Sequence, residues 1–200
     1  IEEGGMSVDF GELVFKKVLQ DIQIINSKLK NQDLKVSINI SPEHFFKYTF
    51  VKDIEVFCKD FSIDTKQIEL EILETSIMKN SEISKNKLDE LHAKGFEIAL
   101  DDFGTGYSSL SYLKNFKVNK LKIDQSFIRD FLEDNNDKAI VQAIINLANI
   151  FNLKVQAEGV ETLEHEKLLH KLDCHLAQGY FYNKPVPLNN FLELIKDKNE

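Results

Sequence analysis

The sequence predicts an α/β domain built around parallel strands. Short β-branched segments alternate with helical segments along the chain, and connections of helix length make consecutive strands parallel. The 200 residues suit one core, and 42% hydrophobic with 29% charged residues is an ordinary globular balance. The three prolines and eight glycines argue against a disordered or fibrous chain. We count six strands, whereas the common closed (β/α) barrel has eight. The sheet is therefore either open or completed by two strands that precede Ile1.

The expected strands are recognised by their length, their β-branched content and the polar turns that follow them. They are residues 36–40, 68–73, 96–100, 120–124, 154–157 and 175–179. The segments between them show apolar residues at three- and four-residue spacing, which is typical of helices. The expected helices are residues 10–29, 50–59, 81–94, 108–115, 137–151, 162–172 and 188–196.

The helix expected at 81–94 has the clearest inward face and the clearest end. Its spacing predicts that Ile83, Leu88 and Leu91 point into the core. Gly95 follows its last turn, where a residue in the left-handed conformation commonly ends a helix.

Charge and cysteine content restrict the setting and the partners. The net charge is −8 and Arg129 is the single arginine, so the chain has no general attraction for a nucleic acid polymer. A phosphodiester substrate would need metal ions to neutralise it. Cys58 and Cys174 lack metal-ligand spacing and are expected to be buried reduced thiols. With no membrane-spanning apolar run and no signal peptide visible, we expect a cytoplasmic segment without membrane contact, which leaves open a tether elsewhere in the protein.

Acidic and amide side chains recur where the expected strands end. The acidic and amide residues are Asn39, Glu71, Asp101, Asp102, Asp124, Glu158, Glu161 and Gln178, and Lys122 lies among them on the fourth expected strand. In a parallel barrel the carboxyl ends of the strands share the face that carries the active site. Carboxylate and amide oxygens suit Mg²⁺ or Mn²⁺, and adjacent aspartates can bridge two ions about 4 Å apart, an arrangement used in phosphodiester hydrolysis. A nearby lysine can stabilise negative charge in the transition state.

Each of these residues also has an ordinary structural interpretation. An Asp-Asp pair after a strand is commonly a turn or a helix cap, and an isolated lysine or asparagine is commonly solvated. Their recurrence at successive strand ends favours a metal–carboxylate site. Gly104 and Gly106 suggest a phosphate-type loop without a full dinucleotide motif. His165 and His170 are one residue too far apart for the zinc pair of a helical protease motif.

The segment 101–110, with the sequence DDFGTGYSSL, resembles the signature loop of EAL-domain cyclic di-GMP phosphodiesterases. Five further motifs occur in the order of that family: SINIS at 37–41, ELEILE at 69–74, LKID at 121–124, AEGVET at 157–162 and QGY at 178–180. The resemblance covers nearly the whole chain. It implies a modified TIM (β/α)8 barrel that hydrolyses cyclic di-GMP to linear pGpG with a two-metal site of Mg²⁺ or Mn²⁺.

The resemblance also implies roles for individual residues. The implied metal ligands are Asn39, Glu71, Asp101, Asp102 and Glu158. The implied catalytic residues are Lys122, Asp124 and Glu158, with Lys122 contacting the nucleophilic water. The residues expected to support the loop and the rim are Glu74, Gly104, Gly106, Glu161 and Gln178. The residues expected to contact the substrate are Ser37, Ser41 and Pro185.

The chain departs from the family pattern in three ways. The Glu-Ala-Leu motif is absent, which agrees with two strands upstream of Ile1. We therefore expect 1–200 to be one N-terminally truncated EAL-type domain of a longer protein, with upstream sensor or cyclase domains and a homodimeric state. Leu73 stands where threonine is common, and Gln125 and Lys184 stand where arginine is frequent. Two alternatives stay open: a catalytically inactive domain that acts as a cyclic di-GMP receptor or regulatory module, and a barrel hydrolase for another phosphoester or metabolite.

Overall fold

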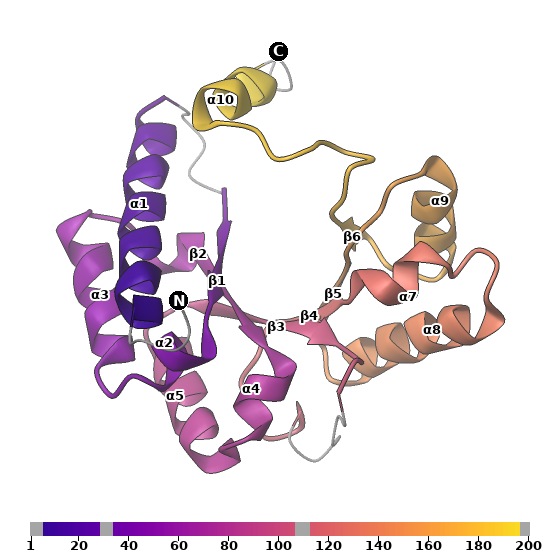
Figure 1. Cartoon of the computed structure of the whole chain (residues 1–200), viewed down its shortest axis with the longest axis horizontal. Coiled ribbons are helices and arrows are strands. Elements are labelled where there is room, and N and C mark those ends of the chain that lie inside the picture. The colour runs from indigo at the N-terminus through magenta and orange to yellow at the C-terminus, as the bar shows by residue number, and fades with distance from the viewer. Residues whose placement is uncertain (1–5, 29–33, 107–112, 197–200) are drawn as a thin grey trace.

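The computed structural model describes residues 6–28, 34–106 and 113–196. Within them, six strands form one parallel sheet in which each strand pairs with the next in the chain. Their bounds are β1 Val36–Ile40, β2 Ile68–Leu73, β3 Glu97–Phe103, β4 Lys120–Ile123, β5 Lys154–Ala157 and β6 Leu176–Ala177. Figure 1 shows the sheet curving into half a barrel, with helices along its outer side. The predicted α/β fold with parallel strands is confirmed, and each expected strand is present.

The helices alternate with the strands as the sequence predicts. Their bounds are α1 Met6–Lys28, α2 Pro42–Phe46, α3 Phe50–Asp60, α4 Glu74–Met78, α5 Ser81–Ala93, α7 Gln125–Arg129, α8 Asn135–Ile150, α9 Leu163–Lys171 and α10 Leu188–Lys196, with a 3-10 turn at Thr65–Gln67. Six of the expected helices are confirmed within a few residues at each end. The helix expected at 108–115 lies largely outside the described residues.

Three short helices at the carboxyl ends of strands were not predicted. Helices α2, α4 and α7 have five residues each, which is too short for an apolar period to be visible. Two of them are set by side-chain caps instead. The Ser41 side chain accepts from the His44 N–H at 3.3 Å, and Asp124 accepts from the Ser126 N–H at 3.0 Å. These caps turn the chain sharply just after β1 and β4.

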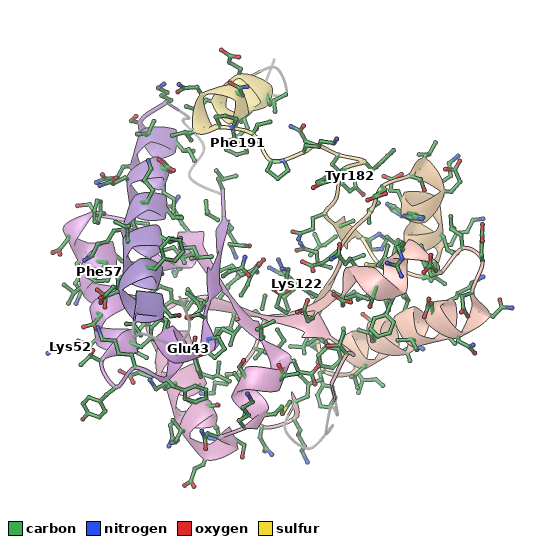
Figure 2. The ribbon with its side chains drawn as sticks, in the orientation of Figure 1. Glu43, Lys52, Phe57, Lys122, Tyr182 and Phe191 are labelled. Carbon is green, nitrogen blue, oxygen red and sulfur yellow. The ribbon has the colours of Figure 1, made fainter. Side chains whose placement is uncertain are left out.

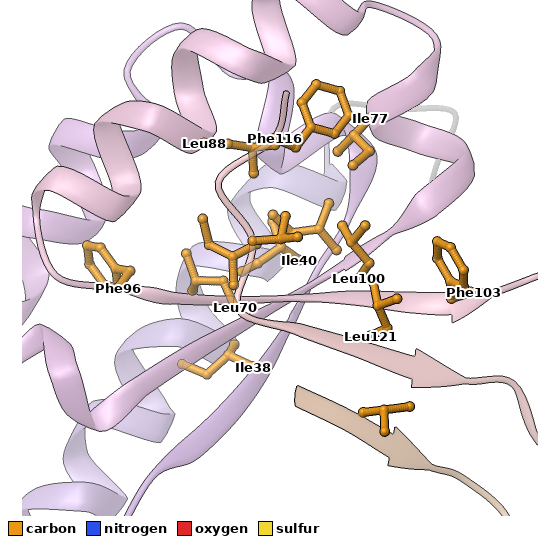
Figure 3. Close-up of a cluster of buried hydrophobic side chains, with 14 of the residues drawn as sticks. Ile38, Ile40, Leu70, Ile77, Leu88, Phe96, Leu100, Phe103, Phe116 and Leu121 are labelled. Atoms are coloured by element: carbon orange, nitrogen blue, oxygen red, sulfur yellow. The ribbon is translucent and has the colours of Figure 1, made fainter. Parts of the chain in front are cut away.

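The two faces of the sheet differ in polarity because side chains alternate along each strand. The outer face is apolar and packs under the helices, as Figure 3 shows. Its buried residues include Ile38, Ile40, Leu70, Leu100 and Leu121. The intervening positions place polar and charged side chains on the inner face, where the site is built.

The inward face of α5 differs from the prediction at one position. Leu88 and Leu91 are fully buried, but Ile83 is 52% exposed and Ser84 is buried in its place. Ile83 lies five residues before Leu88, and at 3.6 residues per turn it points about 140° away from it. Gly95 has φ of +90°, which confirms the predicted left-handed helix end.

The predicted state of the two cysteines is confirmed, because Cys58 and Cys174 are both buried and free. Burial raises the pKa of Cys58 to about 12 and that of Cys174 to about 11. Neither thiol is therefore a nucleophile at neutral pH. Among the helices in the described ranges, we find none that combines the length and the apolar character needed to cross a bilayer.

Candidate functional site

Lys122 is the centre of a cluster of carboxylates on the inner side of the sheet. Its side chain projects from β4 in Figure 2 and is only 2% exposed. The ammonium nitrogen lies 2.7 Å from Glu71 Oε2 and 2.9 Å from Asp101 Oδ1. It also lies 2.6 Å from Glu158 Oε1. One buried lysine thus joins three of the five expected metal ligands.

Strand register brings the remaining strand-end residues to the same place. Asn39 pairs with Glu71 across β1 and β2, and its side chain is exposed on the inner face. Glu158 directly follows β5, and its N–H donates to Ile123 O at 3.2 Å, which fixes it beside β4. The parallel register therefore explains why residues far apart in sequence meet here.

A bulge in β3 lets Asp101 and Asp102 serve the same site. Neighbouring residues in a regular strand point to opposite faces, but the pairing of β3 with β4 shifts register between Leu100 and Phe103. Asp102 adopts a φ of +53°, a left-handed conformation that aspartate tolerates better than most residues. As a result, carboxylate oxygens of Asp101, Asp102 and Glu158 lie within 4.8 Å of one another. Such local strain is a common feature of functional sites.

The cluster carries more negative charge than Lys122 can balance. Burial, together with the charges of Asp101 and Asp124, raises the pKa of Asp102. Burial also raises the pKa of Glu158, although Lys122 opposes this shift. Burial alone would lower the pKa of Lys122, but its three carboxylate partners hold that pKa above its ordinary value. Hard oxygen donors with uncompensated charge fit divalent cations, so the residues present suit Mg²⁺ or Mn²⁺.

Asp124 has a structural contact as well as its position beside the cluster. It caps α7 by accepting from the Ser126 N–H at 3.0 Å and from the Ser126 hydroxyl. Burial opposes ionisation of Asp124, but hydrogen bonds from Ser126, Asp102 and the Gln125 N–H together outweigh it and lower the pKa of that carboxyl. Asp124 therefore stays ionised and raises the pKa of neighbouring Asp102.

Glu74 contacts the part of the signature loop that the structure describes, and its role in supporting the loop stays a prediction. Glu74 is 1% exposed, and its Oε2 accepts from the Gly104 N–H at 3.2 Å. Gly104 has φ of +100°, and a Cβ there would lie 3.0 Å from Ile144 Cδ1. Gly106 lies against Thr75 and Glu74. Residues 107–110 of the loop lie outside the described residues.

Other expected support residues differ in their contacts. Gln178 Nε2 donates to Glu158 Oε1 at 2.6 Å, and its role as a rim support stays a prediction. Glu161 is exposed, and its side chain makes no hydrogen bond to loop residues 101–106. Its role in bracing the loop stays a prediction.

The expected substrate contacts lie at three separate places. Ser37 donates its hydroxyl to Glu69 Oε1 at 2.9 Å on the inner face, and Ser41 caps α2. Pro185 lines a cavity of about 1030 Å³ that also borders Glu158 and Gln178. Aromatic residues along this C-terminal segment, such as Tyr182 in Figure 2, give the cavity an amphipathic wall. A direct role for these residues in substrate binding stays a prediction.

Sequence reasoning missed a second row of polar residues on the inner face. The row consists of Glu69, Lys120 and Gln156, which lie two residues before Glu71, Lys122 and Glu158. The alternation of side chains along a strand was the available signal, because residues two apart share a face. The row lies before the strand ends, where the sequence predicts the site, and was therefore not predicted.

The sequence of this chain matches a known protein family. The EAL domain family model matches residues 1–185. The Bacillus subtilis signaling protein YkoW is 36% identical over 194 residues, which are 97% of this chain and 24% of YkoW. The bifunctional diguanylate cyclase/cyclic di-GMP phosphodiesterase MucR of Pseudomonas aeruginosa is 35% identical over 194 residues, 97% of this chain and 28% of MucR. The chain thus spans about a quarter of the length of these relatives.

Solved structures give the same result. The PaMucR phosphodiesterase in complex with c-di-GMP matches with a TM-score of 0.92 and 34% identity, over 95% of this chain and 76% of that one. Klebsiella pneumoniae BlrP1 in a manganese/cyclic di-GMP complex matches with a TM-score of 0.75 and 26% identity, over 86% of this chain and 44% of that one.

Proposed function

This chain belongs to the EAL domain family, and we propose that it forms the catalytic part of a divalent-metal-dependent phosphodiesterase that converts cyclic di-GMP to linear pGpG. The observation that carries the proposal is the buried contact of Lys122 with three carboxylates. A buried lysine among acids that exceed it in charge is expensive to fold unless the site binds cations.

The proposed ligands divide into two sets that share Asp101. Asn39, Glu71 and Asp101 would hold one ion, and Asp101, Asp102 and Glu158 would hold the other. Bound Mg²⁺ or Mn²⁺ would neutralise the phosphodiester and polarise its phosphorus–oxygen bonds. The carboxylates of the chain set the charge and the hard-oxygen character that such ions require.

The remaining residues would orient the reaction. Lys122 supplies a fixed positive charge where negative charge develops on the phosphoryl oxygens. Asp124 is ionised beside it and would orient the attacking water by accepting a hydrogen bond. In the hydrolysis, a bond forms between the water oxygen and phosphorus, the bond to the 3′ oxygen breaks, and the 3′ oxygen takes up a proton. Glu74 would keep the loop at Gly104 in place during this step.

A receptor that binds cyclic di-GMP without turnover is the second candidate. Gln125 and Lys184 stand where the resemblance leads us to expect arginine, and both line the large cavity. Loss of two guanidinium groups there would weaken the bidentate contacts that orient a phosphate. Cyclic di-GMP could then be held by its remaining contacts without being aligned for hydrolysis.

Hydrolysis of cyclic di-GMP, followed by chromatography, tests the two candidates in the full-length protein and in this chain. We expect Mn²⁺- or Mg²⁺-dependent formation of pGpG that stops with EDTA and in Glu71→Gln. Glu55→Gln is the matched control, because Glu55 pairs with Lys59 on α3 and with Lys94 just after α5, away from the cluster. Retained turnover in Glu71→Gln would overturn the metal assignment. Binding without turnover in the native protein would establish the receptor instead.

For the whole protein, we further infer a cytoplasmic homodimer with sensor or cyclase domains upstream of the chain. The short span of the chain within its relatives, one of which is named as bifunctional, supports the further domains. The homodimer is carried over from the family resemblance, and the cytoplasmic location from the free thiols Cys58 and Cys174. Light scattering on the full-length protein tests the dimer, and a monomeric mass would contradict it.

A further inference from the structure

A second polar row lies on the inner face of the sheet, two residues before the Lys122 cluster along each strand. Its centre is Lys120, whose ammonium nitrogen lies 2.7 Å from Glu69 Oε1 and 2.9 Å from Gln156 Oε1. The Glu69 and Lys120 side chains are 3% and 12% exposed. Ser37 donates a further hydrogen bond to Glu69 at 2.9 Å. The charges of Lys120 and Glu69 in this row cancel and its polar groups are hydrogen-bonded. It is therefore a rigid support rather than a cation site.

Hydrogen bonds connect this row to Glu158, and every donor in the series points toward Glu158. Gln156 Oε1 accepts from Lys120, which leaves its Nε2 to donate to Gln178 Oε1 at 2.9 Å. Because Gln178 Oε1 is occupied, its Nε2 donates to Glu158 Oε1 at 2.6 Å. Each amide is oriented by the group before it, and the cation at the start sets the direction of the whole chain.

The end of the chain is a proposed metal ligand. Glu158 Oε1 accepts a hydrogen bond from Gln178 Nε2 at 2.6 Å and forms an ion pair with Lys122 Nζ at 2.6 Å. Within the described residues, no group donates to Glu158 Oε2, so its lone pairs stay available beside Asp101 and Asp102. The hydrogen bond and the ion pair on one oxygen together restrict the rotation of the carboxylate.

We propose that Lys120 and Gln156 are positioning residues that hold Glu158 in its ligand orientation through Gln178. The inference rests on the proposed metal-dependent function, and it concerns residues that the family resemblance does not assign. Outer residues that orient a ligand commonly change metal affinity or activity by roughly 10- to 100-fold when replaced.

Gln156→Glu tests the direction of the chain. A carboxylate at 156 can still pair with Lys120, so the variant is expected to fold. It has no donor, so Gln178 must turn its Nε2 toward residue 156 and present its oxygen to Glu158. If Gln156 acts by orienting Glu158, this variant should bind Mn²⁺ roughly 10-fold more weakly or worse. Simple attraction by the added negative charge predicts tighter binding, so the two explanations differ in sign.

The measurement is Mn²⁺ titration by calorimetry and by the electron paramagnetic resonance signal of free Mn²⁺, with full-length protein. Gln156→Leu is a second, uncharged variant and should weaken Mn²⁺ in the same direction. Gln142→Glu adds the same charge on α8, where Gln142 Nε2 donates to Asn146 Oδ1, and should leave Mn²⁺ affinity within about twofold. Melting temperatures without metal check that each variant folds.

The outcomes separate the inference from the proposed function. Weaker Mn²⁺ binding in both Gln156 variants, with kcat reduced and the KM for cyclic di-GMP little changed, supports the positioning role. Unchanged or tighter binding in Gln156→Glu overturns it, even if the native protein hydrolyses cyclic di-GMP. If the native protein binds Mn²⁺ without hydrolysis, the proposed function fails and the Mn²⁺ titration still decides the inference. Absence of Mn²⁺ binding in the native protein overturns both.

Discussion

Replacing Lys122 by methionine separates the folding role of this residue from its proposed catalytic role. Methionine keeps the length and fills the space, but it removes the only charge that the structure places between Glu71, Asp101 and Glu158 within its described part. Without a bound cation, these carboxylates repel one another in a site where they are 7%, 15% and 14% exposed.

The cost follows from the burial of the partners. Removing one member of a buried ion pair costs about 3–5 kcal/mol. Asp101 and Glu158 keep some access to water, so we take the lower end, about 3 kcal/mol. For a chain of this size, that corresponds to a fall of about 6–12 °C in melting temperature.

Calorimetric melting at neutral pH, with EDTA and with Mn²⁺, measures this effect. We expect Lys122→Met to melt lower in EDTA and to gain more from Mn²⁺ than the native protein does, because the ion no longer competes with the ammonium group. An ion at a hundred times its dissociation constant adds about 2.7 kcal/mol, which restores most of the loss. Lys122→Met should not hydrolyse cyclic di-GMP even when Mn²⁺ restores its stability. Lys17→Met is the control, since Lys17 is 64% exposed in its pair with Asp21 and contributes under about 1 kcal/mol.

Two results would refute this reasoning. A melting temperature of Lys122→Met within about 2 °C of the native value in EDTA would mean that the three carboxylates do not depend on the lysine. A gain from Mn²⁺ no larger than in the native protein would mean that these carboxylates are not the ligands.

Two further predictions concern the surroundings of the site. Burial lowers the pKa of His44 below its ordinary 6.5, so the unfolded chain gains a proton first as pH falls. The contribution of His44 to stability should therefore decrease below about pH 6.5 and stay constant above it. Melting curves of His44→Phe should lose this part of the pH dependence, and those of exposed His92→Gln should keep it. Gly104→Ala forces alanine into φ of +100° and should cost about 1–3 kcal/mol and most of the hydrolysis. Gly106→Ala, which meets only the Thr75 side chain within 3.4 Å, should cost less by chemical denaturation; an equal loss would contradict the argument.

The strands and long helices could be predicted from the sequence because their signals are local and repeated. The inner and outer faces of β2 and β4 follow from side-chain alternation, which also put Glu71 and Lys122 on one side. Helix α5 shows the limit of this reasoning. Its period was predicted correctly, but the buried position in its first turn is Ser84 rather than the predicted Ile83. An isoleucine is a better core residue than a serine by composition, and only the packed helix shows which of the two is covered.

The sequence by itself determined which residues could form the site: carboxylates, one asparagine and Lys122 at successive strand ends, with a loop specific enough to indicate the family. Tertiary structure alone decided how they meet. The bulge that brings Asp102 to the same side as Asp101 depends on the register between β3 and β4. The order of donors from Lys120 to Glu158 depends on contacts between strands. Cross-strand register and hydrogen-bond direction join residues that are distant in sequence, so no local period can reveal them.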